Sequence, residues 1–282
     1  MIPAAFRYER PQSVAAAIGL LADPEAKVLA GGQSLLPLLR LRMAEPGLLV
    51  DIQDIADLRG MREAGGDVLV GALTPHAELA SRAPWRVLRE AAELTGDRQV
   101  RRLGTIGGAI AHADPAGDLP AALLALDGRV EAEGPEGRRT LPIGEFFVGP
   151  LTTALAPQEL LVALRIPLPG SGAGSSYRKF RQKASGFALA GVGAVVRMEA
   201  GRCRAAGLGV TGVGLAPYAA VAAASRLVGT ELAQRDIEAA LELILDGVDV
   251  QADAYASPDY RARICRLLAA EAITRARAEA RG

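Results

Sequence analysis

Short apolar runs alternate with helically spaced apolar positions over about the first 172 residues. This pattern predicts strands at 6–8, 27–30, 48–52, 61–64, 68–71, 129–133, 138–141 and 159–167. It predicts helices at 14–21, 35–42, 85–94 and 121–126, and one more that begins at Thr74-Pro75. Segment 159–167 is apolar on both faces, which is typical of a strand buried on both sides of a sheet.

The pattern changes after a stretch rich in proline and glycine at 167–174, which we interpret as a domain boundary. Beyond it the pattern predicts first strands and then helices, at 176–180, 189–198, 202–213, 219–228, 235–245 and 258–280. Strands followed by helices indicate an α+β layer. We therefore expect an α+β protein. Its first domain covers 1–172, with subdomains of about 1–55 and 56–172, and a smaller α+β domain with an antiparallel sheet and helices covers 173–282.

Composition and charge exclude several classes of partner. Lys+Arg and Asp+Glu are both 32, so there is no basic excess of the kind that favours nucleic acid or a membrane surface. Glycines and a proline interrupt the uncharged stretch at 205–225, which argues against a membrane span. Cys203 and Cys265 are too few for an iron–sulfur cluster or a disulfide framework. We therefore expect a cytoplasmic protein.

Two glycine pairs are candidate ligand-binding segments. Gly31-Gly32 follows the strand predicted at 27–30 and precedes the helix predicted at 35–42. Gly107-Gly108 lies upstream of the helix predicted at 121–126. Glycine lets backbone N–H groups approach a ligand closely, and a helix N-terminus favours an anion. Two such loops suggest two clamps on one dinucleotide, although a double glycine on its own is often only a turn.

Three segments carry a resemblance to a known family. They read Ala-Gly-Gly-Gln-Ser-Leu-Leu-Pro at 30–37, Thr-Ile-Gly-Gly at 105–108 and His-Ala-Asp-Pro-Ala-Gly-Asp at 112–118. In this order, with about seventy residues between the first two, they resemble the FAD-binding medium subunit of molybdenum hydroxylases, as in aerobic carbon monoxide dehydrogenase and xanthine dehydrogenase. The resemblance covers essentially the whole chain. It implies a two-part PCMH-type FAD-binding domain and a smaller C-terminal flavoprotein domain.

The resemblance also implies which residues hold FAD without a covalent bond. Backbone amides and hydroxyls of two segments would bind the pyrophosphate: Ala30, Gly31, Gly32, Gln33, Ser34 and Leu35, and then Thr105, Ile106, Gly107, Gly108 and Ala109. Asp118 would accept hydrogen bonds from cofactor hydroxyls, although by itself it would be interpreted as a helix cap. Leu161, Tyr177 and Lys179 would lie near the isoalloxazine ring. No catalytic or metal-ligating residue is implied.

Other residues leave alternatives open. Ala109 stands where relatives usually carry Asn, Asp or Ser, so one side-chain contact is lost while the backbone contacts are kept. Gln33 stands where His is common, and it remains a competent polar group. His112 would be at most a neighbour of the flavin. The arginine-rich segment 98–102 could hold phosphate or an acidic partner surface, or it could be a solvated polar connector. No Gly-x-Gly-x-x-Gly or P-loop motif is present, which argues against a Rossmann or P-loop nucleotide site.

The implied function is electron transfer. In this family a large subunit with a molybdenum cofactor oxidises the substrate, and a small subunit with [2Fe-2S] clusters passes electrons to the FAD subunit, which gives them to an external acceptor. The expected assembly is a heterotrimer that can dimerise. Two alternatives remain. A stand-alone FAD-dependent oxidoreductase would need a base from among His112, Asp114 and Lys179, and the other alternative is a non-catalytic FAD-binding or assembly protein. Substrate and acceptor stay open.

Overall fold

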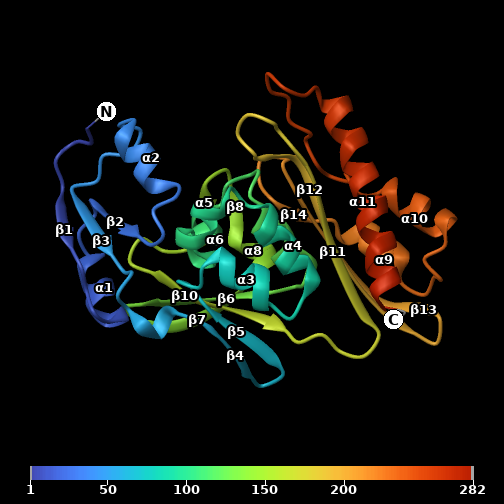
Figure 1. Ribbon diagram of the computed structural model, residues 1–282, viewed down its shortest axis with the longest axis horizontal. Coiled ribbons are helices and arrows are strands. Elements are labelled where there is room, and N and C mark those ends of the chain that lie inside the picture. Colours follow the sequence, from blue (N-terminus) through green and yellow to red (C-terminus); the bar gives the residue numbers. More distant parts are fainter. Residues whose placement is uncertain (1, 281–282) are drawn as a thin grey trace.

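A small parallel sheet forms one end of the molecule in the computed structural model, which describes residues 2–280. Its strand order is β1-β3-β2, and helices α1 and α2 accompany it (Figure 1). The side chain of Ser13 accepts the Ala16 amide and so caps α1, because the first amides of a helix lack partners within it. The bounds are β1 Arg7–Glu9, α1 Val14–Leu20, β2 Ala26–Leu29, α2 Leu35–Arg40 and β3 Leu48–Asp51.

An antiparallel sheet of order β4-β5-β10-β6-β7 forms the middle of the molecule. Leu160 and Val162 of β10 pack into the core of the N-terminal sheet, whereas Leu161, which lies between them and faces the other way, packs into the middle core with Leu164 and Ile166. The prediction of a strand buried on both faces is thus confirmed. The bounds are β4 Met61–Ala64, β5 Asp67–Gly71, β6 Arg129–Gly134, β7 Gly137–Pro142 and β10 Leu160–Pro167.

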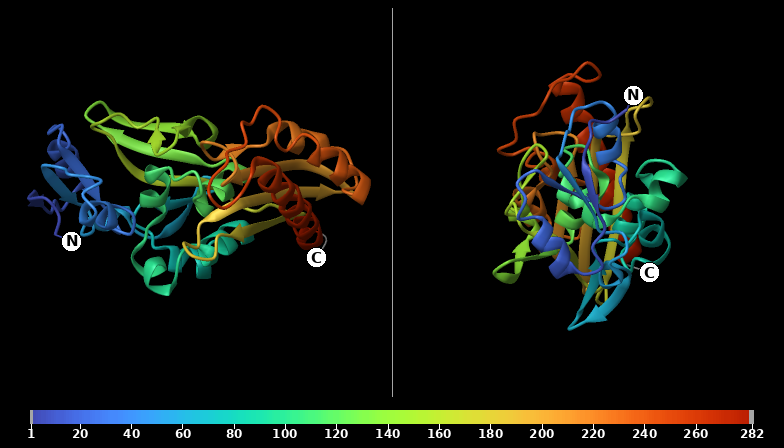
Figure 2. Two further views of the ribbon diagram at one scale, coloured as in Figure 1. Left: turned by 90° about the horizontal axis from the view of Figure 1, so that it is seen from above. Right: turned by 90° about the vertical axis from the view of Figure 1, so that its left-hand side faces the viewer.

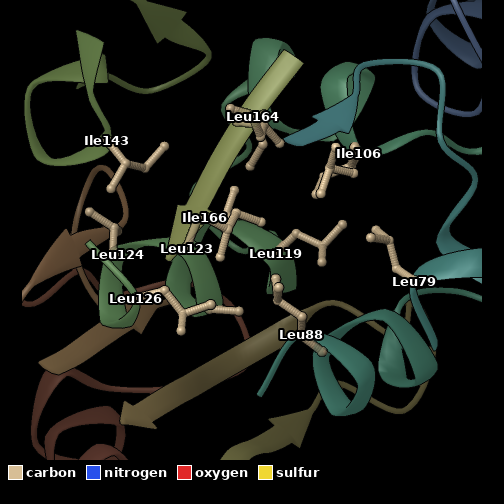
Figure 3. Close-up of a cluster of buried hydrophobic side chains, with 14 of the residues drawn as sticks. Leu79, Leu88, Ile106, Leu119, Leu123, Leu124, Leu126, Ile143, Leu164 and Ile166 are labelled. Carbon is tan, nitrogen blue, oxygen red and sulfur yellow. The ribbon is translucent and has the colours of Figure 1, made fainter. Parts of the chain in front are cut away.

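Five helices follow β5 in the chain; α6 packs on β10 of the middle sheet, and α3, α4, α6 and α7 contribute to a core of aliphatic side chains. Leu88, Ile106, Leu119 and Ile166 converge there from three helices and β10 (Figure 3). Every residue of α7 is buried, which explains why it is apolar all round rather than amphipathic. The bounds are α3 His76–Arg82, α4 Arg86–Leu94, α5 Arg98–Leu103, α6 Ile106–His112 and α7 Asp118–Ala125.

An antiparallel sheet of order β11-β12-β13-β14 forms the other end of the elongated molecule (Figure 2). Helix α11 packs on β11 and β12, while α7 packs on β12 and β13. The contact with α7 is close, because a Cβ at Gly209 would lie 2.0 Å from the Ala121 carbonyl oxygen. The bounds are β11 Ala173–Arg181, β12 Ala188–Glu199, β13 Arg202–Thr211, β14 Tyr218–Ala219, α9 Val221–Leu227, α10 Gln234–Leu241 and α11 Pro258–Ala280.

One local prediction is wrong. Gly107 and Gly108 do not lie in a loop but in the first turn of α6, where the side chain of Thr105 accepts the Gly108 amide. Segment 98–102 forms most of α5, and the Asp97 carboxylate accepts the Gln99 and Val100 amides at the start of this helix. The helix predicted to begin at Thr74-Pro75 is α3; its N-cap residue is Pro75, and the Thr74 hydroxyl donates to the Gly60 carbonyl. Short elements were also missed: a 3₁₀ turn Ala56–Leu58, α8 Ile143–Phe146, β8 Phe147–Gly149, β9 Thr152–Thr153 and β14.

Candidate functional site

The two glycine segments lie against each other although they are far apart in sequence. A Cβ at Gly31 would lie 2.0 Å from the Leu103 carbonyl oxygen and 2.9 Å from the Gly104 Cα atom. A Cβ at Gly108 would lie 3.7 Å from the Cβ of Ala30. Only a residue without a Cβ permits this approach at Gly31. The end of β2 and the start of α6 therefore lie side by side.

The first segment presents hydrogen-bond donors that the protein does not use. Within residues 2–280, the backbone amides of 31–35 donate to no protein acceptor. Ser34 is the N-cap residue of α2, yet its hydroxyl makes no capping bond. Gly32 adopts a left-handed φ of +73°, and the Gln33 side-chain amide donates to the Gly31 carbonyl at 3.0 Å. Free amides and a free hydroxyl at the start of a helix suit an anion such as phosphate.

The second segment uses most of its amides within the protein. The Ile106 and Gly107 amides donate to the carbonyls of Thr74 and Ala72, and the Gly108 amide donates to the Thr105 hydroxyl. A Cβ at Gly107 would lie 2.7 Å from the Ala72 carbonyl oxygen, so this glycine allows α6 to pack against the chain after β5. Thr105, Ile106 and Gly107 are buried, whereas Gly108 and Ala109 are partly exposed. Gly108 and Ala109 are therefore the residues of this segment that a ligand can reach.

Asp118, Tyr177 and Lys179 meet in a buried cluster between α7 and β11. The Tyr177 hydroxyl donates to Asp118 Oδ1 at 2.7 Å, and Lys179 Nζ donates to Asp118 Oδ2 at 2.8 Å. Lys179 Nζ also lies 3.2 Å from the Leu94 carbonyl oxygen. The single proton of the Thr95 hydroxyl is shared between the Ala91 carbonyl oxygen at 2.9 Å and Asp118 Oδ2 at 3.3 Å. The Lys179 and Asp118 side chains are only 2% and 6% exposed. Thr95 was not predicted, and its place at the end of α4 gives no signal in the sequence.

Burial sets the protonation of this cluster. Burial raises the pKa of Asp118, and the Lys179 ammonium and the hydroxyls of Tyr177 and Thr95 oppose that shift. Burial and the neighbouring Asp118 carboxylate raise the pKa of Tyr177 well above its usual value, so Tyr177 stays a hydrogen-bond donor. Asp118 is not the cap of α7, because Gly117 holds that position.

The remaining predicted residues do not join this cluster. Leu161 is buried in β10 among the middle core, and β10 packs against α6. His112 ends α6, and its Nε2 lies 4.0 Å from Asp114 Oδ2, with both side chains about one quarter exposed. Of the three bases that a stand-alone oxidoreductase could use, Lys179 is thus held by Asp118, and His112 and Asp114 lie near each other.

A buried histidine lies behind the meeting point of the two segments. His76 is 4% exposed, and its Nδ1 has no hydrogen-bond partner. A Cβ at Gly104 would lie 2.9 Å from its Nε2. Burial and then the Arg101 charge lower the pKa of His76 to about 4. The ring is therefore neutral in the folded protein near neutral pH.

We expect His76 to make the protein sensitive to acid. Above the unfolded pKa of about 6.5 the ring is neutral in both states, so it contributes no pH dependence to the free energy of unfolding there. As pH falls from there towards 4, the unfolded chain binds a proton that the folded protein rejects, so about 3 kcal/mol of stability is lost. Urea unfolding at several pH values should show a shallower loss in His76→Leu than in the wild type. Parallel pH profiles for the two proteins would contradict this role.

Similarity to known proteins covers nearly the whole chain. The model described as "FAD binding domain in molybdopterin dehydrogenase" matches residues 4–169, and the one described as "CO dehydrogenase flavoprotein C-terminal domain" matches 175–276. The carbon monoxide dehydrogenase medium chain of Afipia carboxidovorans is 39% identical over 100% of both chains. Subunit alpha of the 6-hydroxypseudooxynicotine dehydrogenase complex of Paenarthrobacter nicotinovorans is 36% identical, over 100% of this chain and 97% of that one.

A solved structure agrees with these relatives. A chain of reconstituted CO dehydrogenase from Oligotropha carboxidovorans superposes with a TM-score of 0.95 at 38% identity, over 99% of this chain and 100% of that one. The fold and the matches define a flavoprotein subunit of an oxidoreductase, with an FAD-binding domain and then an antiparallel sheet with helices. The chain belongs to the family of FAD-binding medium subunits of molybdenum hydroxylases.

Between residues 2 and 280 no helix has both the length and the apolar character that crossing a membrane requires. In that same part of the chain, no group of three or more His, Cys, Asp or Glu side chains is placed to hold a metal ion.

Proposed function

We propose that this chain receives electrons from the [2Fe-2S] clusters of a partner subunit and passes them through a non-covalently bound FAD to an external acceptor. Membership of the family supports this proposal, as do the two relatives described above, which are a medium chain and a subunit of a complex. The observation that carries it is the set of free amides at 31–35, lying against the start of α6. FAD would supply the capacity to take up and release electrons.

The residues of the chain would divide the work of holding FAD. The amides of 31–35 and the Ser34 hydroxyl would bind the pyrophosphate, with Gly108 and Ala109 closing the site from α6. Asp118 has one oxygen, Oδ1, that accepts only the Tyr177 hydroxyl within the described residues, and this oxygen would accept a cofactor hydroxyl. Tyr177, Lys179 and Leu161 would lie towards the ring. The Lys179 ammonium would then favour the more negative, reduced cofactor.

The proposal extends to domains and partners. The FAD-binding part would cover 1–172, with subdomains of about 1–55 and 56–172, and the C-terminal part would cover 173–282. The molybdenum cofactor and the [2Fe-2S] clusters would reside in a large and a small partner subunit, and a heterotrimer of the three would work in the cytoplasm. The pair Cys203 and Cys265 is too small a set of thiols to ligate a cluster here.

Replacing Ser34 by alanine should weaken FAD binding about two- to tenfold. The change removes one hydrogen bond to the pyrophosphate, typically about 0.5–1.5 kcal/mol. The exposed Ser81 of α3 is the matched control, and Ser81→Ala should leave binding unchanged. Titration of the FAD-free protein with FAD, followed by flavin fluorescence, measures both. Equal affinity in Ser34→Ala and the wild type would remove the hydroxyl from the proposed site.

The function itself is tested by expressing the chain alone and with candidate large and small subunits. The expected results are a yellow protein with one FAD per chain and a complex in which substrate reduces that FAD. A yellow protein that a small molecule reduces without partners would indicate the stand-alone oxidoreductase. Failure to bind FAD would refute the proposal, and FAD without electron transfer in the complex would leave a binding or assembly role.

A further inference from the structure

Three hydrogen bonds join helix α4 to strand β11, and so connect the FAD-binding part to the C-terminal sheet. The three contacts, in order along both elements, are Val87 N–H to Ser175 Oγ (3.1 Å), Tyr177 N–H to Glu90 Oε2 (2.7 Å) and Lys179 Nζ to the Leu94 carbonyl oxygen (3.2 Å). Steps of three or four residues on a helix advance about as far as two residues on a strand. The helix and the strand therefore run alongside each other with matched spacing.

The carboxylate of Glu90 makes the central one of these contacts between α4 and β11. Its Oε2 accepts the Tyr177 amide at 2.7 Å and the Ser176 hydroxyl at 2.9 Å. Its Oε1 accepts Arg86 Nε at 2.7 Å and lies 3.9 Å from Arg275 Nη1. The side chain is only 17% exposed. One carboxylate thus contacts residues of α4, β11 and α11. The sequence pattern does not predict this role.

The need for Glu90 follows from the position of β11 at the edge of its sheet. The amides of Ser175 and Tyr177 are not paired with β12, and they donate to the carboxylates of Glu279 and Glu90 instead. Side chains two residues apart on a strand share a face, so Tyr177 and Lys179 both reach Asp118. Where Glu90 holds the Tyr177 backbone therefore decides where the Lys179 ammonium lies.

We propose that Glu90 is a positioning residue that places Lys179 on Asp118 and through this pair tunes the reduction potential of the flavin. The inference rests on the proposed function, in which Lys179 lies towards the ring. Without the carboxylate, β11 would lose its hold on α4 and the ammonium would move. The size of the effect follows from the interaction of two unit charges at an effective dielectric constant of about 20. If the ammonium moved from about 4 Å to about 6 Å from a negative charge on the reduced flavin, the equilibrium constant for reduction would fall about tenfold.

The test is a redox titration of FAD-loaded variants, with FAD content checked in each. Glu90→Ala should lower the midpoint potential by up to about 30 mV, which is tenfold for a two-electron couple. Glu90→Gln keeps an oxygen for the Tyr177 amide and should stay near the wild type. Glu93→Ala, which changes an exposed residue of the same helix, is the matched control and should not shift the potential.

A second background separates positioning from general loosening of the structure. In the variant Asp118→Asn/Lys179→Met the charge pair is gone, so adding Glu90→Ala should shift the potential no further. An equal shift in both backgrounds would overturn the positioning role of Glu90, and so would no shift in the wild-type background at full FAD content. Neither outcome would overturn the proposed function.

Hydrogen exchange of the FAD-free protein gives an independent readout. Glu90→Ala should speed exchange at 175–181 and Glu93→Ala should not, and unchanged exchange would also contradict the proposal. A wild type without FAD would overturn the proposed function together with this inference.

Discussion

Replacing Lys179 by methionine is expected to lower the free energy of unfolding by about 3–5 kcal/mol. Methionine fills a similar space but leaves the Asp118 carboxylate, 6% exposed, without its cation. Tyr177 and Thr95 would still donate to it, but neither carries charge. Urea or thermal unfolding of the FAD-free protein measures the effect without any contribution from the cofactor. A loss of this size is a large share of the stability of a typical domain.

Two further variants make the measurement specific to the buried pair. Lys183→Met removes an exposed lysine close in sequence, and it should change stability by less than about 0.5 kcal/mol. Asp118→Asn/Lys179→Met replaces both charges, and it should recover most of the loss because no unpaired charge is left in the interior. If Lys179→Met were as stable as the wild type, the ammonium group would not be paired with Asp118 in solution.

Replacing Gly31 by alanine is expected to weaken FAD binding about five- to hundredfold. The added Cβ would lie 2.0 Å from the Leu103 carbonyl oxygen, a backbone atom that cannot rotate away. The two glycine segments would have to separate, at a cost typical of overpacking, about 1–3 kcal/mol. FAD titration measures the change in affinity, and unfolding measures the change in stability.

Gly19 provides the matched control for this substitution. It lies in α1, and a Cβ there would have no neighbour within 4 Å. Gly19→Ala should therefore leave FAD binding unchanged and leave stability equal or slightly higher, since alanine favours a helix over glycine. Full FAD affinity in Gly31→Ala would mean that the close approach of β2 to α6 is not needed for the cofactor.

Most strands and helices could be predicted because their apolar residues repeat with a clear period. The strand at 159–167 is an example, since both of its faces are apolar and both are buried. Helix α6 was missed because Gly107 and Gly108 are poor helix formers. Tertiary contacts decide there: Gly107 must be small where α6 meets Ala72, and the Thr105 side chain supplies the cap.

The candidate site was only partly readable from the sequence. The resemblance pointed separately to Asp118 and Lys179, but nothing in the pattern said that these two residues, 61 positions apart, pair with each other. Likewise the two glycine segments look alike in sequence, yet the amides of 31–35 are free while those of Ile106 and Gly107 are taken by the protein. Such differences depend on which partner each backbone group finds in space. The contacts of the individual residues with FAD stay predictions.

The carboxylates along β11 have a consequence for solubility. An uncovered edge strand is a template on which another chain can add a strand, and sheets that grow in this way aggregate. Here Glu279, near the end of α11, holds the Ser175 amide, and a Cβ at Gly174 would lie 2.1 Å from the Ala276 carbonyl oxygen. The last turns of α11 therefore shield this edge. A chain cut before 276 would expose the strand and lose its protection against edge-to-edge aggregation.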